Sequence, residues 1–386
     1  MTIVTDNQIT LLCNGAEFFP ALASAINEAS DEIYLQTYIF EPDVTGRAIG
    51  NALKNAAQRG VEVNLLLDGY GSKDLAKSYI QELKSAGVNV AFYRPRISPW
   101  TLKRSRLHRM HRKVAVIDGY LGFVGGINII DDYNTPDHIP PRIDYAVKIT
   151  GPLLGDIRLS AVLLWRRTTK IFVKKINPAI VKKNEWSTQL ASMSAAFLVR
   201  DNFKHRRDIE DAYLTAIHSA KSEVLIANAY FIPGPRFRHA LFEAAKRGVR
   251  VRLLLQQKVE YLLVDIASHA LYGAMLDNGI EIYEYHQSQM HSKVAVIDNK
   301  WSMVGSSNID PFSLLMSLEA NIWVDDYTFA QQLQRSIESA IQLSASKVDN
   351  NHWSQRPYHQ RILSWAVYGL VRVLISLAAY GYDQTK

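Results

Sequence analysis

The stretch HRKVAVIDGYLGFVGGIN, residues 111–128, joins a histidine and a lysine to a short apolar segment that ends in an Asp-Gly pair. The apolar run predicts a buried β-strand, and the Asp-Gly pair predicts a hairpin turn after it. Side chains at positions i and i+2 of a strand point to the same side, so His111 and Lys113 are expected to project together. The stretch HSKVAVIDNKWSMVGSSN, residues 291–308, repeats the pattern with His291 and Lys293.

The duplication extends well beyond these two stretches. Residues 31–69 contain an apolar strand, a loop, an amphipathic helix ending at Arg-Gly and a second apolar strand, and residues 222–257 repeat this order. Strands that alternate with helices at this spacing predict an α/β fold with mixed or parallel sheets covered by helices. The chain is therefore expected to be a tandem duplication of one α/β half.

The repeats divide the chain into four predicted segments. The two halves are expected at residues 1–165 and 196–348, joined by a basic connector at 166–195. Residues 349–386 form a hydrophobic C-terminal tail, in which residues 361–383 are almost wholly apolar. Arg372 lies near the middle of that run, where a charge is costly inside a bilayer, so an amphipathic helix lying in the membrane surface fits better than a membrane span. A core helix packed on the protein is the alternative.

Composition narrows the class of protein. The chain has 386 residues, of which 48% are hydrophobic and 21% charged, as in a well-packed globular protein. Cys13 is the single cysteine, which rules out an internal disulfide and a cysteine-rich zinc cluster. The N-terminal sequence has no basic segment followed by an apolar one, so we expect no cleaved signal peptide and a cytoplasmic location.

The positive charge of the chain points to an anionic partner. The formal net charge is +7, and residues 94–109 hold six arginines or lysines with no acidic residue. Nucleic acid and an acidic lipid surface both fit this charge. The basic segment is expected to contact an anionic surface, with Trp100 and Leu102 available to enter a membrane interface. A solvated basic loop is the alternative.

The residues repeated in the two stretches suit chemistry at a phosphodiester. Displacement at phosphorus requires a nucleophile, a proton donor for the leaving oxygen, and donors for the charged non-bridging oxygens. Two histidines supply the first two functions, and the two lysines supply positive charge. The predicted additional phosphate-binding positions are Gly126, Asn128, Ser306 and Asn308.

A metal site is the competing explanation for the histidines. The sequence has no HExxH motif and no acidic cluster, and a lysine beside each histidine would repel a cation. No glycine-rich nucleotide-binding loop occurs either. We therefore expect a site with no metal and no cofactor.

These stretches resemble the paired HxKxxxxD motifs of the phospholipase D superfamily, each followed by glycine and asparagine. The resemblance implies that the two halves pack pseudo-symmetrically, with one active site at their interface. It also implies that one histidine forms a covalent phosphohistidine while the other serves as acid and base. We expect His111 to be the nucleophile, with the reverse assignment left open.

The same resemblance assigns further residues to the site. In the superfamily an acidic residue downstream of each motif orients a histidine, and Asp144 and Glu319 occupy comparable places here. The motif aspartates, Asp118 and Asp298, complete the catalytic set, although their position at turns favours an architectural role.

The resemblance extends to the bacterial cardiolipin synthases, in particular the shorter B type without N-terminal transmembrane helices. It rests on LLDGYGSKDL at 66–75, RMHRKVAVIDGYLGFVGGIN at 109–128 and DYAVKITGP at 144–152. Those enzymes transfer a phosphatidyl group from one phosphatidylglycerol to another and release glycerol; some also use phosphatidylethanolamine. The implied partner is an anionic membrane containing phosphatidylglycerol and cardiolipin, bound peripherally on the cytoplasmic side of the bacterial inner membrane, with no nucleic acid expected.

Other functions remain open at this stage. A hydrolase of the phospholipase D type would pass the phosphatidyl group to water, and a nuclease or phosphodiesterase would use the basic surface for a phosphate backbone. A non-enzymatic membrane scaffold is a third possibility, and the intact histidines, lysines, aspartates and asparagines of both halves argue against it. The sequence does not indicate the oligomeric state.

Overall fold

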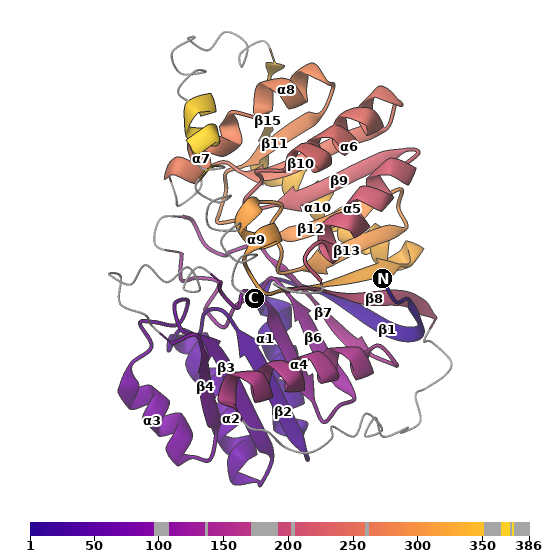
Figure 1. Cartoon of the computed structure of the whole chain (residues 1–386). Helices are drawn as coiled ribbons and strands as arrows, with labels where there is room; N and C mark the ends of the chain where they lie inside the picture. Colours follow the sequence, from indigo (N-terminus) through magenta and orange to yellow (C-terminus); the bar gives the residue numbers. More distant parts are fainter. Residues whose placement is uncertain are drawn as a thin grey trace, which may run out of the picture.

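Strands and helices follow one another in the order that the repeats predict (Figure 1). The structure, a computed structural model, describes residues 1–95, 108–135, 138–170, 192–201, 205–258, 262–350, 364–370 and 373. The first half contains β1 (Val4–Cys13), α1 (Asn14–Glu28), β2 (Glu32–Thr37), α2 (Val44–Gln58), β3 (Glu62–Asp68), α3 (Lys77–Ser85), β4 (Asn89–Tyr93), β5 (Lys113–Ile117), β6 (Leu121–Gly125), β7 (Tyr145–Thr150) and α4 (Leu154–Thr169).

The second half repeats this order. It contains β8 (Met193–Arg200), α5 (Asp208–Ser219), β9 (Glu223–Asn228), α6 (Pro235–Lys246), β10 (Arg250–Gln256), α7 (Leu262–His269), α8 (Tyr272–Asp277), β11 (Glu281–Tyr285), β12 (Lys293–Ile297), β13 (Trp301–Gly305), α9 (Pro311–Leu315), β14 (Glu319–Asp325), α10 (Tyr327–Ser344) and β15 (Ala345–Lys347).

Each half has a mixed sheet. In the first half β2, β3 and β4 are parallel, and β5, β6, β7 and β1 continue the sheet with antiparallel pairings. The second half has the same arrangement, with β9, β10 and β11 parallel and β12 antiparallel to β9. Strand β8 pairs with both β14 and β1, so hydrogen bonds connect all strands into one 15-stranded sheet. The predicted fold of two tandem α/β halves is confirmed.

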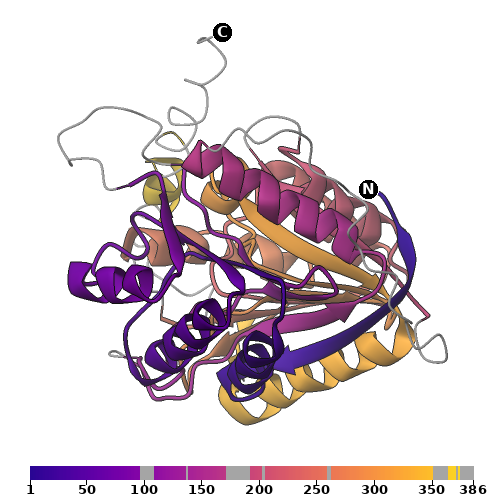
Figure 2. The same ribbon diagram turned by 90° about the horizontal axis from the view of Figure 1, so that it is seen from below.

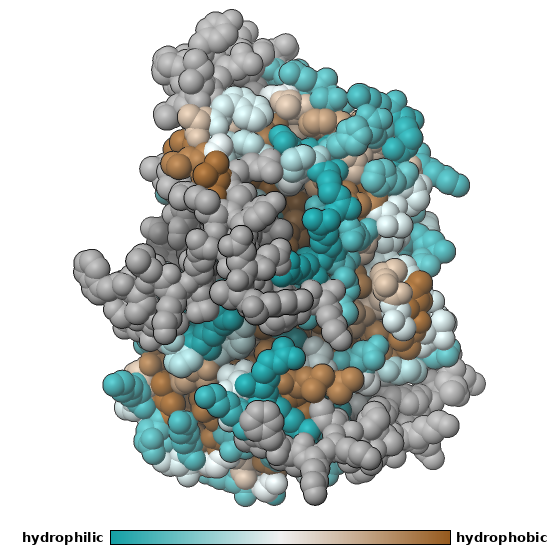
Figure 3. Space-filling view, in the orientation of Figure 1, coloured by the Kyte–Doolittle hydropathy of each residue, from teal (hydrophilic) through white to brown (hydrophobic). Residues whose placement is uncertain are grey.

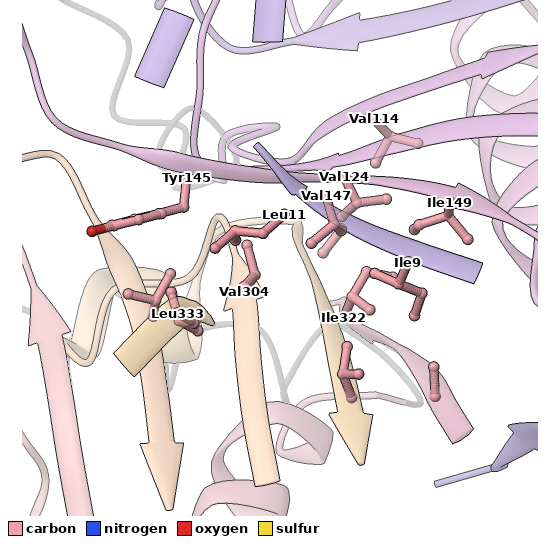
Figure 4. Packing of buried hydrophobic residues seen from close by; sticks show 14 of the residues in the cluster. Ile9, Leu11, Val114, Val124, Tyr145, Val147, Ile149, Val304, Ile322 and Leu333 are labelled. Carbon is pink, nitrogen blue, oxygen red and sulfur yellow. The ribbon is translucent and has the colours of Figure 1, made fainter. Parts of the chain in front are cut away.

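The two halves pack against each other through the inner faces of their sheets. Figure 4 shows Ile9, Val124 and Val147 of the first half facing Val304 and Ile322 of the second. Burial of this apolar surface is the dominant favourable contribution to holding the halves together, at roughly 25 cal/mol per Å² removed from water. A rigid interface is therefore expected wherever residues of both halves meet.

The strand VAVI of the first motif is buried on both sides, which explains its unbroken apolar sequence. Val114 and Val116 belong to the core between the halves, whereas Ala115 and Ile117 belong to the core beneath α1, α2 and α3. Alternating side chains thus enter two different cores. This double burial fixes the register of the strand and, with it, the positions of the residues at its ends.

Helices enclose both faces of the packed sheets. Helices α4 and α10 contribute to the core between the halves and lie on opposite sides of the strands in Figure 2. Helices α5, α6 and α8 cover the outer face of the second half. On the face shown in Figure 3, hydrophilic residues gather at the upper right, where α6 lies, as expected for a solvent-facing helix.

The predicted hairpin turns join β5 to β6 and β12 to β13. Asp118 and Gly119 have φ of +48° and +70°, and Asp298 and Asn299 have φ of +51° and +54°. Two successive residues with positive φ are the requirement of a type I′ turn, which Asp, Asn and Gly tolerate best.

The predicted segment boundaries differ from the elements of the structure. The boundaries at residues 165 and 196 fall inside α4 and β8, so the predicted connector 166–195 overlaps both halves. Its central residues, 171–191, and most of the basic segment, 96–107, lie outside the described residues. The prediction that the basic segment contacts an anionic surface therefore stays a prediction.

The predicted tail is described only at residues 364–370 and 373. This part is helical, and Tyr368 is buried in the core of the second half with its ring 5.6 Å from the Arg238 guanidinium. Trp365 and Leu370 on the same helix are exposed. The helix therefore both packs on the protein and presents apolar side chains to solvent. Within the described ranges, no helix has the length and apolar character needed to cross a membrane.

Candidate active site

The two motif histidines lie together at the interface of the halves. The ring centroids of His111 and His291 are 6.4 Å apart, with the ring planes inclined by 69°. Each histidine is anchored to the opposite half through its backbone: His111 N donates to Leu318 O at 2.9 Å, and His291 N donates to Ile143 O at 2.8 Å. The packing of the sheets therefore builds one site from two half-sites.

Each histidine is paired with a carboxylate from the other half. His111 Nδ1 lies 3.1 Å from both Glu319 oxygens, and His291 Nδ1 lies 2.7 Å from Asp144 Oδ2. Both carboxylates are buried, Glu319 at the start of β14 and Asp144 just before β7. Because the carboxylates hold Nδ1, Nε2 is the ring nitrogen available for chemistry in both histidines. The sequence pointed to these two acids but not to their exchange between halves.

The two lysines lie at the first positions of β5 and β12. Lys113 Nζ donates to His111 O at 2.6 Å, and Lys293 Nζ donates to His291 O. Lys293 Nζ is also 3.9 Å from Asp144 Oδ2. Burial and the charge of Lys293 lower the pKa of Lys113 to about 7, and burial lowers the pKa of Lys293 to about 8, although Asp144 and Glu319 oppose that shift. Two buried lysines in one site favour the binding of an anion.

The same burial shifts the histidines and one of their carboxylates. Burial lowers the pKa of His111, with Glu319 opposing and Lys113 reinforcing the shift. Burial and the charges of Lys293 and Lys113 lower the pKa of His291 well below its ordinary value. Burial also raises the pKa of Asp144 to about 6, against the effect of Lys293. Both imidazoles are therefore neutral at pH 7, the state that a nucleophile requires.

Gly126 and Ser306, predicted to bind phosphate, each lie against the carboxylate of their own half. Ser306 Oγ donates to Glu319 Oε2 at 2.5 Å and accepts from Ala320 N at 3.0 Å. At the matching position of the first half, a Cβ on Gly126 would lie 2.3 Å from Asp144 Oδ1. The hydroxyl of Ser306 thus donates to the longer side chain, Glu319. The absence of a side chain at Gly126 leaves space for the shorter one, Asp144. The predicted binding of phosphate by Gly126 and Ser306 stays a prediction.

Asn128 and Asn308 are buried, each on the loop that follows the returning strand of its motif. Asn128 Oδ1 accepts from Ile39 N at 3.1 Å, so its amide nitrogen is the group that can donate to a ligand. Asn308 Oδ1 is buried without a hydrogen-bond partner among the described residues. The phosphate-binding assignment of both asparagines stays a prediction.

The two motif aspartates lie at the opposite end of their strands and do not reach the histidines. Asp118 accepts from Ser30 N, Asp31 N and Glu32 N at 2.8 to 2.9 Å, which fixes the start of β2. Asp298 holds the start of β9 in the same way. Since a strand rises about 3.3 Å per residue, an aspartate seven positions after the histidine is about 20 Å away. These contacts support the architectural role that their position at turns favours, and their place in the catalytic set stays a prediction.

The sequence did not indicate the function of two further residues near the histidines. Asp68 and Gln256 are the last residues of β3 and β10, and they accept from Met110 N at 2.8 Å and Met290 N at 2.6 Å. Each fixes the backbone just before a motif histidine. The two residues occupy matching positions in the repeats. Because one is a carboxylate and the other an amide, the sequence did not indicate that both accept a hydrogen bond from the same backbone position.

Tyr38 and Arg142 also border the site. The Tyr38 ring lies 5.0 Å from the His111 ring and 5.5 Å from Lys113 Nζ. Arg142 lies two residues before Asp144 and donates through Nε and Nη2 to Gln289 Oε1 at 3.1 and 3.0 Å. Neither residue has a counterpart of the same type in the other half. In the part of the chain that the structure describes, no three side chains of histidine, cysteine, aspartate or glutamate gather as a possible metal site.

Comparison with known proteins places this geometry in a family. A sequence model described as "cardiolipin synthase, PLD-like domain" matches residues 22–137 and 213–341, one region in each half. Among solved structures, the crystal structure of phosphatidylserine synthase from Haemophilus influenzae superposes with a TM-score of 0.68 over 98% of this chain and 96% of that chain. At 13% sequence identity, this likeness shows the common fold alone.

Curated relatives are similar over most of the sequence. Cardiolipin synthase B of Salmonella typhimurium is 40% identical over 354 residues, covering 91% of this chain and 84% of the relative. Cardiolipin synthase B of Escherichia coli is 38% identical over 362 residues, with the same coverage. The chain belongs to the cardiolipin synthase family of phospholipase D-like proteins.

Proposed function

We propose that this protein is a phosphatidyltransferase that makes cardiolipin from two molecules of phosphatidylglycerol and releases glycerol. The observation that carries the proposal is the facing pair of histidines, each held through Nδ1 by a carboxylate and each accompanied by a buried lysine. The names of the curated relatives, cardiolipin synthase B, support the choice of substrate.

In the first step, His111 Nε2 attacks the phosphorus of the donor lipid. A nitrogen–phosphorus bond forms, the bond from phosphorus to the glycerol oxygen breaks, and His291 Nε2–H gives its proton to that oxygen. Lys113 and Lys293 neutralise the charge on the non-bridging oxygens. Glu319 stabilises the positive charge that develops on the His111 ring.

In the second step, the hydroxyl of the acceptor lipid replaces glycerol. Its proton passes to His291 Nε2, its oxygen bonds to phosphorus, and the nitrogen–phosphorus bond to His111 breaks. Both histidines thereby return to their starting states. The 6.4 Å separation of the ring centroids suits a single phosphoryl group transferred between the two sides.

His291 must carry a proton when the first step begins. In the protein alone, burial and the neighbouring lysines disfavour this state. A bound phosphodiester adds a negative charge between those lysines, which opposes their effect and raises the pKa of His291. Substrate binding thus prepares the acid that the step requires.

Incubation with phosphatidylglycerol vesicles tests the proposal, with products followed by mass spectrometry. We expect cardiolipin and glycerol in equal amounts, and loss of both in His111→Ala and His291→Ala. Phosphatidic acid in place of cardiolipin would identify a hydrolase. Absence of lipid turnover in a folded protein, with cleavage of nucleic acid, would identify a nuclease.

We also propose that the protein acts as a peripheral enzyme on the cytoplasmic face of an anionic bilayer. The net charge of +7 supports attraction to such a surface, where each nearby cation contributes about 1 kcal/mol. Exposed Trp365 and Leu370 supply apolar side chains for the interface. Flotation with anionic vesicles should recover the protein and flotation with zwitterionic vesicles should not; equal recovery would contradict the electrostatic part of the proposal.

A further inference from the structure

The surroundings of the two histidines differ in charge. Beside His111, Arg109 Nε lies 3.3 Å from Asp68 Oδ2, so a carboxylate balances the arginine. The positions that match Arg109 and Asp68 in the second motif are Gln289 and Gln256. Neutral amides thus replace an ion pair on the His291 side.

Arg142 brings a further positive charge to the His291 side, where Asp144 and Lys293 also lie. Its guanidinium donates to Gln289 Oε1 and, at 3.0 Å, to Asn134 O, both of which are uncharged acceptors. None of the ion pairs within 4.0 Å that join described residues includes Arg142. The side chain is partly exposed, and its charge contributes to lowering the pKa of His291. Asp132 and Asp144 interact with this charge at longer range, but the direct acceptors of the guanidinium are neutral. Arg142 is therefore a cation near the reacting centre that retains capacity for an anionic ligand.

The two sides also differ in the side chains at matching positions. Tyr38 lies against the His111 ring, whereas the matching residue of the second half is Ala229, whose backbone N–H bonds to Ser292 O at 2.9 Å. A large aromatic side chain thus borders His111, and a methyl group stands at the matching place of the other half. The smaller side chain favours the His291 side for a second bulky substrate.

We propose that Arg142 binds the phosphate of the acceptor phosphatidylglycerol while its hydroxyl is deprotonated by His291. This inference rests on the proposed function, which brings two phosphodiesters to one site. Lys113 and Lys293 serve the phosphate that is transferred, so the acceptor phosphate needs another cation. In the acceptor lipid, only the glycerol headgroup separates the reacting hydroxyl from the phosphate. When the hydroxyl lies at His291, the phosphate is therefore expected close by, where Arg142 supplies a cation.

The experiment measures how one phosphohistidine intermediate divides between two acceptors. Phosphatidylglycerol vesicles are supplied with ethanol, and cardiolipin and phosphatidylethanol are quantified together in the same sample. Both products come from the same intermediate, so defects in donor binding cancel in their ratio. Ethanol has no phosphate. The formation of phosphatidylethanol therefore measures phosphatidyl transfer without the proposed contact between Arg142 and the acceptor phosphate.

Arg142→Gln should lower the ratio of cardiolipin to phosphatidylethanol at least tenfold, through a higher KM for the acceptor lipid. Arg142→Lys, which keeps the charge but loses the planar guanidinium, should recover part of the ratio. Arg236→Gln on α6, where Arg236 pairs with Asp211 on the surface, is the matched control and should keep the wild-type ratio.

An unchanged ratio in Arg142→Gln would overturn the inference, as would an equal fall in both products. A fall in the ratio for Arg109→Gln without one for Arg142→Gln would assign the acceptor to the opposite side. Wild-type protein that forms neither product would instead overturn the proposed function itself.

Discussion

His111 and Glu319, separated by 208 positions in the sequence, form a hydrogen-bonded pair across the two halves, with Nδ1 3.1 Å from each carboxylate oxygen. Asp144 and His291 form the reciprocal pair, at 2.7 Å. Each motif histidine is therefore paired with a carboxylate of the other half. The interface between the halves is therefore part of the proposed active site, and a change that loosens it is expected to misplace both histidines.

Replacing each acid by its amide should separate the functions of the two histidines. Glu319→Gln and Asp144→Asn should each lower cardiolipin formation about 100-fold or more, because the histidine loses the charge that orients and stabilises it. A p-nitrophenyl ester of phosphatidic acid has a leaving group that needs no proton. Release of p-nitrophenol should therefore recover in Asp144→Asn but not in Glu319→Gln, as measured by the burst in absorbance.

The reverse result, with recovery in Glu319→Gln alone, would make His291 the nucleophile. Thermal melting of both variants serves as the control for folding. Recovery in neither variant would indicate that both carboxylates act only by positioning the rings.

Gly126→Ser should abolish most activity even though the matching residue of the second half is serine. A Cβ at this position would lie 2.3 Å from Asp144 Oδ1, so the carboxylate must move away from His291. We expect a loss of at least 100-fold in kcat with the fold retained, measured by cardiolipin synthesis and circular dichroism. The double variant Gly126→Ser/Asp144→Glu reproduces the Ser306–Glu319 combination and should recover part of the loss. Wild-type activity in the single variant would show that Asp144 tolerates displacement.

Much of the architecture could be predicted because local patterns determine it. The VAVI strands, their Asp-containing turns and the repeated strand–helix–strand units each have a physical signature within a short window. The internal repeat then implied that the two halves fold alike. Family resemblance contributed the expectation that both motifs share one site.

The exchange of acids between halves could not be predicted from the repeat. Asp144 and Glu319 occupy equivalent positions in the two halves. The same sequence pattern is therefore compatible with each acid pairing with the histidine of its own half or with that of the other half. The close contact of Gly126 with Asp144 and the hydrogen bond of Asp68 to Met110 N arise from tertiary packing. Segment boundaries failed for a related reason, since α4 and β8 continue into a stretch whose basic composition resembles a linker.

Asp298→Asn should destabilise the fold with little effect on chemistry. Burial opposes ionisation of this carboxyl, but backbone N–H groups of Glu223, Lys221 and Ser222 and the Ser222 hydroxyl hold its pKa below the ordinary value. Loss of these charge-assisted hydrogen bonds should cost about 2 kcal/mol in the free energy of unfolding, measured by urea denaturation. The kcat of the folded protein should fall less than threefold.

The pH dependence of that cost follows from the lowered pKa. The stabilisation is present above the ordinary carboxyl pKa and is lost as the pH falls through the folded-state value. The difference between wild type and Asp298→Asn should therefore be constant from pH 5 to pH 8. Asp277→Asn, at an exposed position, is the control. A difference that grows or vanishes within this range would contradict the assigned contacts.

The buried lysines should set the basic limit of activity. A lysine binds phosphate only when protonated, and the pKa of Lys113 is lowered to about 7 and that of Lys293 to about 8. Both lysines are charged below these values and lose the proton as the pH rises through them. Since the phosphodiester itself does not titrate in this range, kcat/KM should fall from about pH 7 to pH 8, two to three pH units below the limit of an ordinary lysine.

The acidic limit should come from His111, which must be neutral to attack phosphorus. Burial lowers its pKa, so activity should persist below the ordinary histidine value of about 6.5 before it declines. Initial rates with a short-chain soluble phosphatidylglycerol, measured from pH 5 to pH 10, avoid effects of pH on vesicles. A kcat/KM that stays constant up to pH 10 would show that the lysines remain protonated in the free enzyme. The carboxylates of Asp144 and Glu319 would then raise the pKa of both lysines enough to cancel the lowering by burial and by the repulsion between the lysines.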